Sequence, residues 1–317
     1  SAFFEKTPKL WQYRARAAVL TSIEHDHVDI YPDAASYERA FETFVAGLPV
    51  DGLLVAFAGD PAVRRIASSA RCRVVWYALS GDDTGAIDPT WSAAPMAVTG
   101  GATPFELFAG GSLAGRLLSP LAGHHNLRNT LACFALVAER YGVAPATLAG
   151  ALRAFRGVKR RQELIGVAGG VLVYDDFAHH PTAVRETIRA LRSRHSRVIA
   201  AFEPRSATAS RRLHQDDYPV AFAGADLSVL APVGRALPDG ERLDVGAIAA
   251  SIQAGGGRAE APPSHDAVLE RLLAEARPGD AVVLMSNGDF GGLHDRLLGM
   301  LAARGLRAKW ESSDASA

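Results

Sequence analysis

The stretch Y-D-D-F-A-H-H-P-T-A, residues 174–183, places two carboxylates and two imidazoles between a predicted strand and a predicted helix. Residues 171–173 before it are an apolar run of strand type. Pro181 suits the first turn of a helix, because its missing N–H has no helical partner there. Open α/β sheets bind their ligands at the carboxyl ends of strands. The stretch therefore indicates a ligand site in an α/β fold; a capped, solvated turn is the alternative.

The composition restricts the classes of protein that fit. The chain has 317 residues, a length that predicts two domains. Its 34 basic and 34 acidic side chains give a formal net charge of zero. No basic run indicates nucleic acid, and no apolar run or signal peptide indicates a membrane. Two cysteines, Cys72 and Cys133, favour a reducing cytoplasm over a disulfide scaffold. The chain begins without Met, which we interpret as a fragment of a longer protein.

Strand-like apolar runs alternate with amphipathic helical stretches, which predicts an α/β fold with mostly parallel sheets. The pattern breaks at G-V-K-R-R, residues 157–161, so the predicted domains are residues 1–156 and 157–317. The expected strands are residues 17–23, 53–57, 73–77, 163–167, 171–175, 197–202, 226–231 and 281–285, with short β pieces at 96–98 and 105–108. The expected helices are residues 34–46, 60–70, 126–141, 145–155, 181–193, 209–223, 244–254, 264–276 and 291–304.

Two polar motifs in the first half resemble nucleotide or metal sites. E-H-D-H-V-D, residues 24–29, follows a predicted strand; a carboxylate-rich loop of this kind suits Mg²⁺ beside a phosphate better than zinc. Its alternative is a plain polar loop. Asn126 and Asn129 lie three apart at a helix start, and an amide matches the donor and acceptor of an adenine edge. N-capping by Asn126 would explain only one of the two.

Three further segments are expected at the same edge as Asp176. Arg161 lies fifteen residues before it, at the far side of a predicted hairpin, where it can hold a phosphate or stack on a base. A solvated junction arginine is the alternative. The loops 202–206 and 286–292 follow parallel strands, so they share this rim or serve only as loops. Their candidate substrate contacts are Arg205, Ser206, Asn287 and Asp289. No G-x-x-x-x-G-K-[ST] phosphate loop occurs.

The ordered series E-x-D-H-x-D, H-N-x-x-N and R-x-E…D-D-x-x-H-H-P-T resembles the Mur ligase family. Its members are ATP-dependent amide ligases of bacterial cell-wall synthesis with three domains. The resemblance implies that residues 1–156 are the second half of the central ATPase domain. Residues 157–317 would be a complete, Rossmann-like carboxyl-terminal domain with a mostly parallel sheet. The family's UDP-sugar domain and phosphate loop are not in this sequence.

The resemblance also implies roles for single residues. His27 matches the histidine that binds the second Mg²⁺, and Asn126 and Asn129 match the pair that reads adenine. Arg161 matches the arginine on the nucleotide phosphates, and Asp176 matches the aspartate on the ribose. The loops 203–206 and 286–290 match regions that line the peptide pocket. At the position where several relatives carry a carbamoylated lysine this chain has Phe41, so we expect no carbamate.

Within the family, D-D-F-A-H-H-P-T-A and F-E-P-R-S are most similar to the branch that joins a recycled tripeptide to UDP-N-acetylmuramate. That implies activation of a lactyl carboxylate by ATP with Mg²⁺, and attack by the peptide amine, with His179 or His180 taking the proton. The L-alanine-adding branch, a folylpolyglutamate synthetase relative and a non-catalytic nucleotide- or peptide-binding module are the alternatives. We expect a cytoplasmic monomer or weak oligomer, and no activity from these 317 residues alone.

Overall fold

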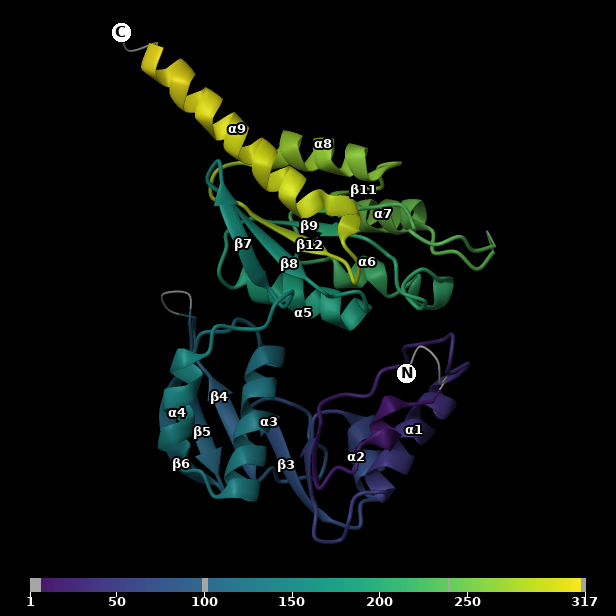
Figure 1. The fold of residues 1–317 in the computed structure, drawn as a ribbon, viewed down its shortest axis with the longest axis vertical. Helices are drawn as coiled ribbons and strands as arrows, with labels where there is room; N and C mark the ends of the chain where they lie inside the picture. Colours follow the sequence, from purple (N-terminus) through teal and green to yellow (C-terminus); the bar gives the residue numbers. More distant parts are fainter. Residues whose placement is uncertain (1–6, 99–101, 239, 315–317) are drawn as a thin grey trace. The chain divides into compact units, whose positions relative to one another are not determined.

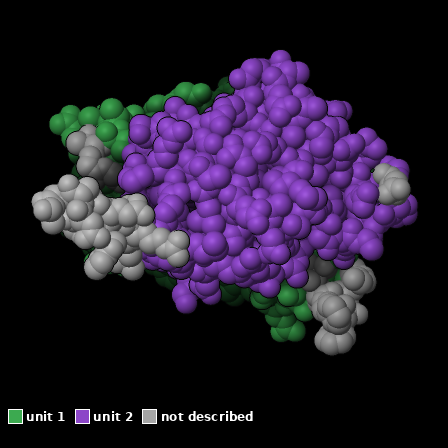
Figure 2. All heavy atoms as spheres, turned by 90° about the horizontal axis from the view of Figure 1, so that it is seen from above, with its two compact units in different colours: residues 1–156 green, residues 157–317 purple. Residues whose placement is uncertain are grey.

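The computed structural model describes residues 7–98, 102–238 and 240–314, with side chains as far as residue 305. The chain divides into two compact units, Ser1–Arg156 and Gly157–Ala317, which Figure 2 shows in separate colours. Each unit has its own sheet, and the predicted α/β fold with two mostly parallel sheets is confirmed. Among the described residues, no helix is both long and apolar enough to cross a membrane.

Unit 1 has a six-stranded sheet in the order β1-β2-β3-β4-β5-β6 (Figure 1). The first four strands are parallel to one another, β5 pairs antiparallel with β4, and β6 pairs antiparallel with β5. Its strands are β1 (Ala17–Leu20), β2 (Leu53–Phe57), β3 (Arg73–Leu79), β4 (Trp91–Pro95), β5 (Thr103–Ala109) and β6 (Ser112–Ser119). Its helices are α1 (Ala34–Ala46), α2 (Pro61–Ala67), α3 (His124–Tyr141), α4 (Pro145–Ala154) and the short η1 (Lys9–Gln12).

Both faces of the unit 1 sheet are covered by helices. Alternate residues of β2 explain this, because successive side chains of a strand point to opposite faces. Val55 packs with residues of α3 and α4, whereas Leu54 packs with residues of α1 and α2. Asp60 caps α2 through the backbone N–H groups of Ala62 and Val63, and also accepts from the N–H of Ile23. This carboxylate therefore ties the start of α2 to the end of β1.

Unit 2 has a second six-stranded sheet in the order β11-β10-β9-β12-β8-β7. All neighbouring strands are parallel except β7, which pairs antiparallel with β8 through the Gly169-Gly170 turn. Its strands are β7 (Glu163–Ala168), β8 (Val171–Asp176), β9 (Val198–Phe202), β10 (Leu227–Leu230), β11 (Ala259–Glu260) and β12 (Ala281–Met285). Its helices are α5 (Pro181–Arg192), α6 (Tyr218–Ala221), α7 (Val245–Ala254), α8 (His265–Glu275), α9 (Leu293–Asp314), η2 (Arg212–His214) and η3 (Phe290–Gly292).

Unit 2 is also a three-layer α/β/α structure. Helices α5, α6 and α7 pack on one face of the sheet, and α8 and α9 pack on the other. The central strand β12 is buried throughout: Val283 packs against the first set of helices and Leu284 against the second. An apolar strand without polar alternation is what a central parallel strand requires.

Several sequence predictions about elements were wrong or incomplete. The β piece expected at 96–98 lies just after β4, which pairs with β3 and β5 over Trp91–Pro95, and the short β11 was not expected. The helix expected at 209–223 is only η2 and α6, because Pro219 lacks an N–H and forces a new helix to begin there. Strand β6 was missed, although the Gly110-Gly111 turn before it has the positive φ angles of a tight hairpin turn. The last helix, α9, continues to Asp314 instead of ending at residue 304; residues 315–317 lie outside the described part of the chain.

Candidate functional site at the carboxyl edge of the second sheet

The carboxyl ends of β8, β12 and β9 lie side by side in the unit 2 sheet. Met285 pairs with Asp176 on one side and with Phe202 on the other, so the loops that follow these three strands share one rim. The backbone N–H of Ser286 donates to the carbonyl of Asp176 at 3.0 Å, and that of Glu203 donates to Met285 at 2.9 Å. The expectation of a common rim is therefore confirmed.

Asp176 is almost fully buried at this rim, with 4% of its surface exposed. Its carboxylate accepts hydrogen bonds from the N–H of Gln162 at 2.8 Å and the N–H of Ala178 at 2.7 Å, and one from Thr187. These donors use three of its roughly four acceptor positions. Burial raises the pKa of Asp176, while the two backbone hydrogen bonds and the charge of Arg161 oppose that rise. The side chain thus ties the segment before β7 to the turn after β8.

The two junction arginines lie on one aromatic ring. Both guanidinium carbons lie 5.1 Å from the centroid of Phe177. Arg160 also contacts Asp175, with 3.3 Å between Nε and Oδ2, and donates to the carbonyls of Ser286 and Gly288. Arg161 is exposed. The sequence analysis proposed a role for Arg161 and none for Arg160. The only feature of the sequence that points to Arg160 is that it stands next to Arg161 in an arginine pair.

A buried carboxylate that the sequence did not single out organises the other two loops. Glu203, with 2% of its surface exposed, accepts a hydrogen bond from the Ser286 hydroxyl and lies 3.2 Å from Nε2 of His265. Beside it, Arg205 pairs with Asp289 at 2.7 Å across the two loops. That pair brings together two of the predicted substrate contacts and lowers the pKa of Asp289, mainly through the Arg205 hydrogen bond.

The two adjacent histidines differ in their surroundings. Nδ1 of His179 lies 3.0 Å from the carbonyl of Phe177, so this nitrogen must carry the proton and Nε2 is the basic one. His180 is the N-cap of α5: its Nδ1 accepts from the N–H of Thr182 at 3.4 Å, and its Nε2 is buried. His180 therefore caps the start of α5, and His179 has no such capping role.

The predicted site residues of unit 1 lie in two places. His27, in the loop after β1, has a half-exposed side chain whose Nε2 is 4.0 Å from Oδ2 of Asp26. Asn126 is not the N-cap of α3, which is Gly123; its amide instead donates to the carbonyl of Ala122 at 2.8 Å. Asn129 is exposed on the next turn. The capping alternative for Asn126 is thus wrong.

Two family descriptions match consecutive parts of this chain. Residues 4–137 match the Mur ligase middle domain, and residues 160–288 match the Mur ligase glutamate ligase domain. The chain belongs to the Mur ligase family. Homologues in this family are ATP-dependent amide ligases.

Named relatives of this Mur ligase chain fall in two groups. The UDP-N-acetylmuramate–L-alanyl-γ-D-glutamyl-meso-2,6-diaminoheptandioate ligase of Escherichia coli is 33% identical over 97% of this chain and 64% of its own length. The UDP-N-acetylmuramate–L-alanine ligase of Rubrobacter xylanophilus is 34% identical over 94% and 65%. A murein peptide ligase from Psychrobacter arcticus superposes with a TM-score of 0.63 at 29% identity, over 95% of this chain and 61% of that one. The chain thus spans less than two thirds of the length of these relatives.

The Mg²⁺ expectation for this Mur ligase chain was tested on its donors. Within the part of the chain that the structure describes, no three His, Cys, Asp or Glu side chains converge as a metal site. Mg²⁺ commonly takes one or two protein ligands and completes its shell with phosphate oxygens and water. The described residues therefore do not form a complete Mg²⁺ site by themselves.

Backbone strain is concentrated at the candidate sites of both units. Among the described residues, four non-glycine residues have positive φ angles: His27 (56°), Arg160 (58°), Gln162 (51°) and Phe290 (49°). Such conformations cost roughly 1–3 kcal/mol each and persist where the surroundings fix them, often at functional sites. Three of them lie at the unit 2 rim and the fourth is the predicted metal ligand, which supports the placement of both sites.

Proposed function

We propose that this protein is an ATP-dependent amide ligase that joins the tripeptide L-Ala-γ-D-Glu-meso-diaminopimelate to UDP-N-acetylmuramate. One observation carries the proposal: the turn D-D-x-x-H-H-P and the loops E-P-R-S and S-N-G-D lie at one rim of the unit 2 sheet. The chain that has this rim is similar over 97% of its length to the Escherichia coli tripeptide ligase described above. We expect it to act in the cytoplasm as a monomer or weak oligomer during cell-wall recycling.

Each unit has its own candidate residues for nucleotide binding. Asn126 and Asn129 present amides on successive turns of α3, which suits the donor and acceptor edge of adenine. In unit 2, the exposed Arg161 suits the phosphates, and the remaining acceptor position of Asp176 suits a ribose hydroxyl. His27 would contribute one ligand to Mg²⁺, which when bound supplies neutralising charge for the transferring phosphoryl group.

The rim would bind the acceptor peptide and accept its proton. Arg205 and Asp289, a cation and an anion 2.7 Å apart and both partly exposed, suit the charged groups of a peptide; Ser206 and Asn287 add hydrogen-bonding groups beside them. An oxygen of the lactyl carboxylate first attacks the γ-phosphorus of ATP; the bond between that phosphorus and the β–γ bridging oxygen breaks, ADP leaves, and an acyl phosphate is formed. The peptide amine then forms the amide bond at the carbonyl carbon, the bond to phosphate breaks, and Nε2 of His179 takes the amine proton.

An activity assay of the protein encoded by the complete open reading frame tests this proposal. The protein is supplied with ATP, UDP-N-acetylmuramate and either the tripeptide or L-alanine, and released phosphate and ligated product are measured. Tripeptide is the expected acceptor, and the 317 residues expressed alone should give no turnover. Ligation of L-alanine with no use of tripeptide would refute the recycling function.

The alanine ligase is a second candidate, because the Rubrobacter xylanophilus enzyme is as similar to this chain as the tripeptide ligase is. Ligation of L-alanine in the same assay would select it. A non-catalytic nucleotide-binding module is the third, and it would bind ATP without releasing phosphate. The three outcomes are distinguished by one set of reactions.

A further inference from the structure

Arg160 contacts other residues of unit 2 through both its backbone and its side chain. Its backbone N–H donates to Oε2 of Glu163 at 2.7 Å, and its carbonyl accepts from the N–H of Phe177 at 2.9 Å. Its φ angle of 58° lies in the left-handed region, which is costly for a residue with a side chain. These contacts fix the backbone of Arg160, while its side chain remains 34% exposed.

The guanidinium of Arg160 links three segments. It donates to the carbonyls of Ser286 and Gly288, lies 3.3 Å from Asp175 at the end of β8, and covers one part of the Phe177 ring. The planar fork of an arginine can reach two carbonyls and an aromatic face together, which a lysine ammonium cannot. The loop 286–289 thus has its backbone fixed by a residue of the domain junction.

The same ring carries Arg161, the neighbour expected on the nucleotide phosphates. A ligand that draws Arg161 into a fixed position restricts the Phe177 ring, and the ring in turn restricts Arg160. The loop that Arg160 holds contains Asn287 and Asp289, two of the proposed peptide contacts. One short path of direct contacts therefore runs from the nucleotide side to the peptide side, entirely within unit 2.

We propose that Arg160 is a positioning residue that couples the two substrates, so that a bound nucleotide tightens binding of the acceptor peptide through Phe177 and the 286–289 loop. This inference rests on the proposed function. Coupling of this kind is reciprocal, because each ligand changes the affinity of the other by the same factor. Arg160 itself touches neither substrate in this scheme.

The test uses the protein encoded by the complete open reading frame, in the presence of UDP-N-acetylmuramate. Calorimetry measures its affinity for the tripeptide with and without a non-hydrolysable ATP analogue, and the ratio of the two affinities reports the coupling. The analogue should tighten peptide binding by about fivefold or more. Arg160→Lys should reduce that ratio to about one while the affinity for the analogue stays unchanged. Phe177→Leu should reduce the ratio as well, and Phe177→Tyr, which keeps the ring, should preserve it.

Arg258→Lys is the matched control, because Arg258 contacts Glu275 at the opposite end of the sheet. It should leave the ratio unchanged. A wild-type ratio near one, or an unchanged ratio in Arg160→Lys, overturns the inference while the ligase function stands. Failure of the wild type to bind the analogue or the tripeptide at all overturns the proposed function itself. If Arg160→Lys does not fold, the two Phe177 variants decide.

Discussion

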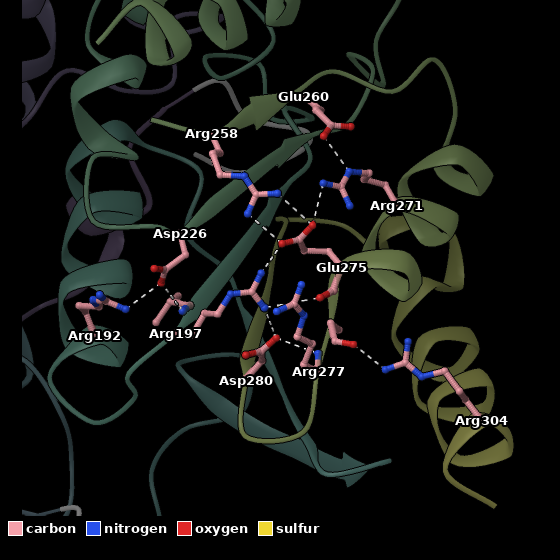
Figure 3. Close-up of polar contacts among 12 residues, drawn as sticks. Arg192, Arg197, Asp226, Arg258, Glu260, Arg271, Glu275, Arg277, Asp280 and Arg304 are labelled. Carbon is pink, nitrogen blue, oxygen red and sulfur yellow. Dashed lines mark hydrogen bonds and ion pairs between the residues drawn. The ribbon is translucent and has the colours of Figure 1, made fainter. Parts of the chain in front are cut away.

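The two ends of the unit 2 sheet both gather charged residues, but they use them differently. At the amino end, Figure 3 shows arginines and carboxylates paired with one another. Glu275 alone is contacted by Arg258, Arg271 and Arg197, and Arg197 also pairs with Asp280. Hydrogen bonding from Arg258 is the largest of the effects that lower the pKa of Glu275 to about 2. Charge at this end is compensated within the protein.

At the carboxyl end there are single ion pairs, such as Arg205–Asp289, and backbone groups supply many of the other partners. Asp176 is held by N–H groups and its pKa is raised by burial, the opposite direction to Glu275. Arg160 donates to two carbonyls, and Arg161 lies exposed on an aromatic ring. A buried ionisable group whose pKa is shifted by desolvation beside a specific charge, as Asp176 is beside Arg161, is typical of ligand sites. The comparison separates an ion-pair network that stabilises the fold from a rim available to a ligand.

The strongest test of this difference is Arg161→Met. Removing the cation that we propose to contact the nucleotide phosphates should lower kcat/KM about a hundredfold to a thousandfold. Because the guanidinium is exposed, the free energy of unfolding should change by less than about 0.5 kcal/mol. Steady-state kinetics and denaturant unfolding of the complete protein measure both. If the loss of activity came with a comparable loss of unfolding free energy, Arg161 would be a residue that stabilises the fold, as the arginines at the amino end of the sheet are.

The reverse result is expected for Glu275→Gln. This change leaves arginine side chains at the amino end without their shared carboxylate, and breaking such a pair should cost about 3 kcal/mol of unfolding free energy. The kcat of the folded protein should not change. Glu260→Gln, which removes a more exposed partner of Arg271, is the control and should cost about 0.5 kcal/mol.

The pH dependence of unfolding checks the same carboxylate. The folded pKa of Glu275, about 2, is below its ordinary value of 4.5, so its contribution to stability is complete above pH 4.5 and is lost as the pH falls toward 2. Glu275→Gln should remove that part of the acid dependence. An identical acid profile in the variant would show that Glu275 is not ionised with a lowered pKa in the folded state.

A smaller effect is expected from Gly288→Ala. A Cβ at this position would lie 2.1 Å from Nη1 of Arg205, so the flexible guanidinium must move and its pair with Asp289 must break. The KM for tripeptide should rise about tenfold, equal to roughly 1.4 kcal/mol, with little change in stability. An unchanged KM would remove Arg205 from the peptide site. Gly234→Ala, whose Cβ would meet Arg205 only at 3.7 Å, is the matched control.

The smallest effect is expected for Gln162→Gly at the rim. The φ angle of 51° costs a residue with a side chain roughly 1–2 kcal/mol, partly offset by the greater entropy of glycine in the unfolded chain. Stability should rise by about 0.5 kcal/mol. Gln162→Ala removes the same side chain without freeing φ and should not stabilise. A gain in the alanine variant would attribute the effect to the side chain instead of the backbone.

The sequence predicted the elements with clear periodicity and the rim that they form. The D-D-F-A-H-H-P stretch, with Pro181 after it, was sufficient to place a strand end and a helix start. Sequence alone could not find Glu203 or Arg160 as organising residues, because their importance arises from contacts between loops distant in the chain. It also could not show that His180 and not His179 caps α5, since that difference depends on the hydrogen bonds of their ring nitrogens.

The central position of β12 has a consequence for folding. This strand lies late in the sequence, yet it pairs with β8 and β9, and those two strands have no hydrogen bond to each other without it. Pairings between distant segments form slowly, because loop closure must precede their stabilising contacts. The rim and the hydrophobic core should thus appear in the same kinetic step. During synthesis, the candidate site does not exist until the residues of β12 have left the ribosome.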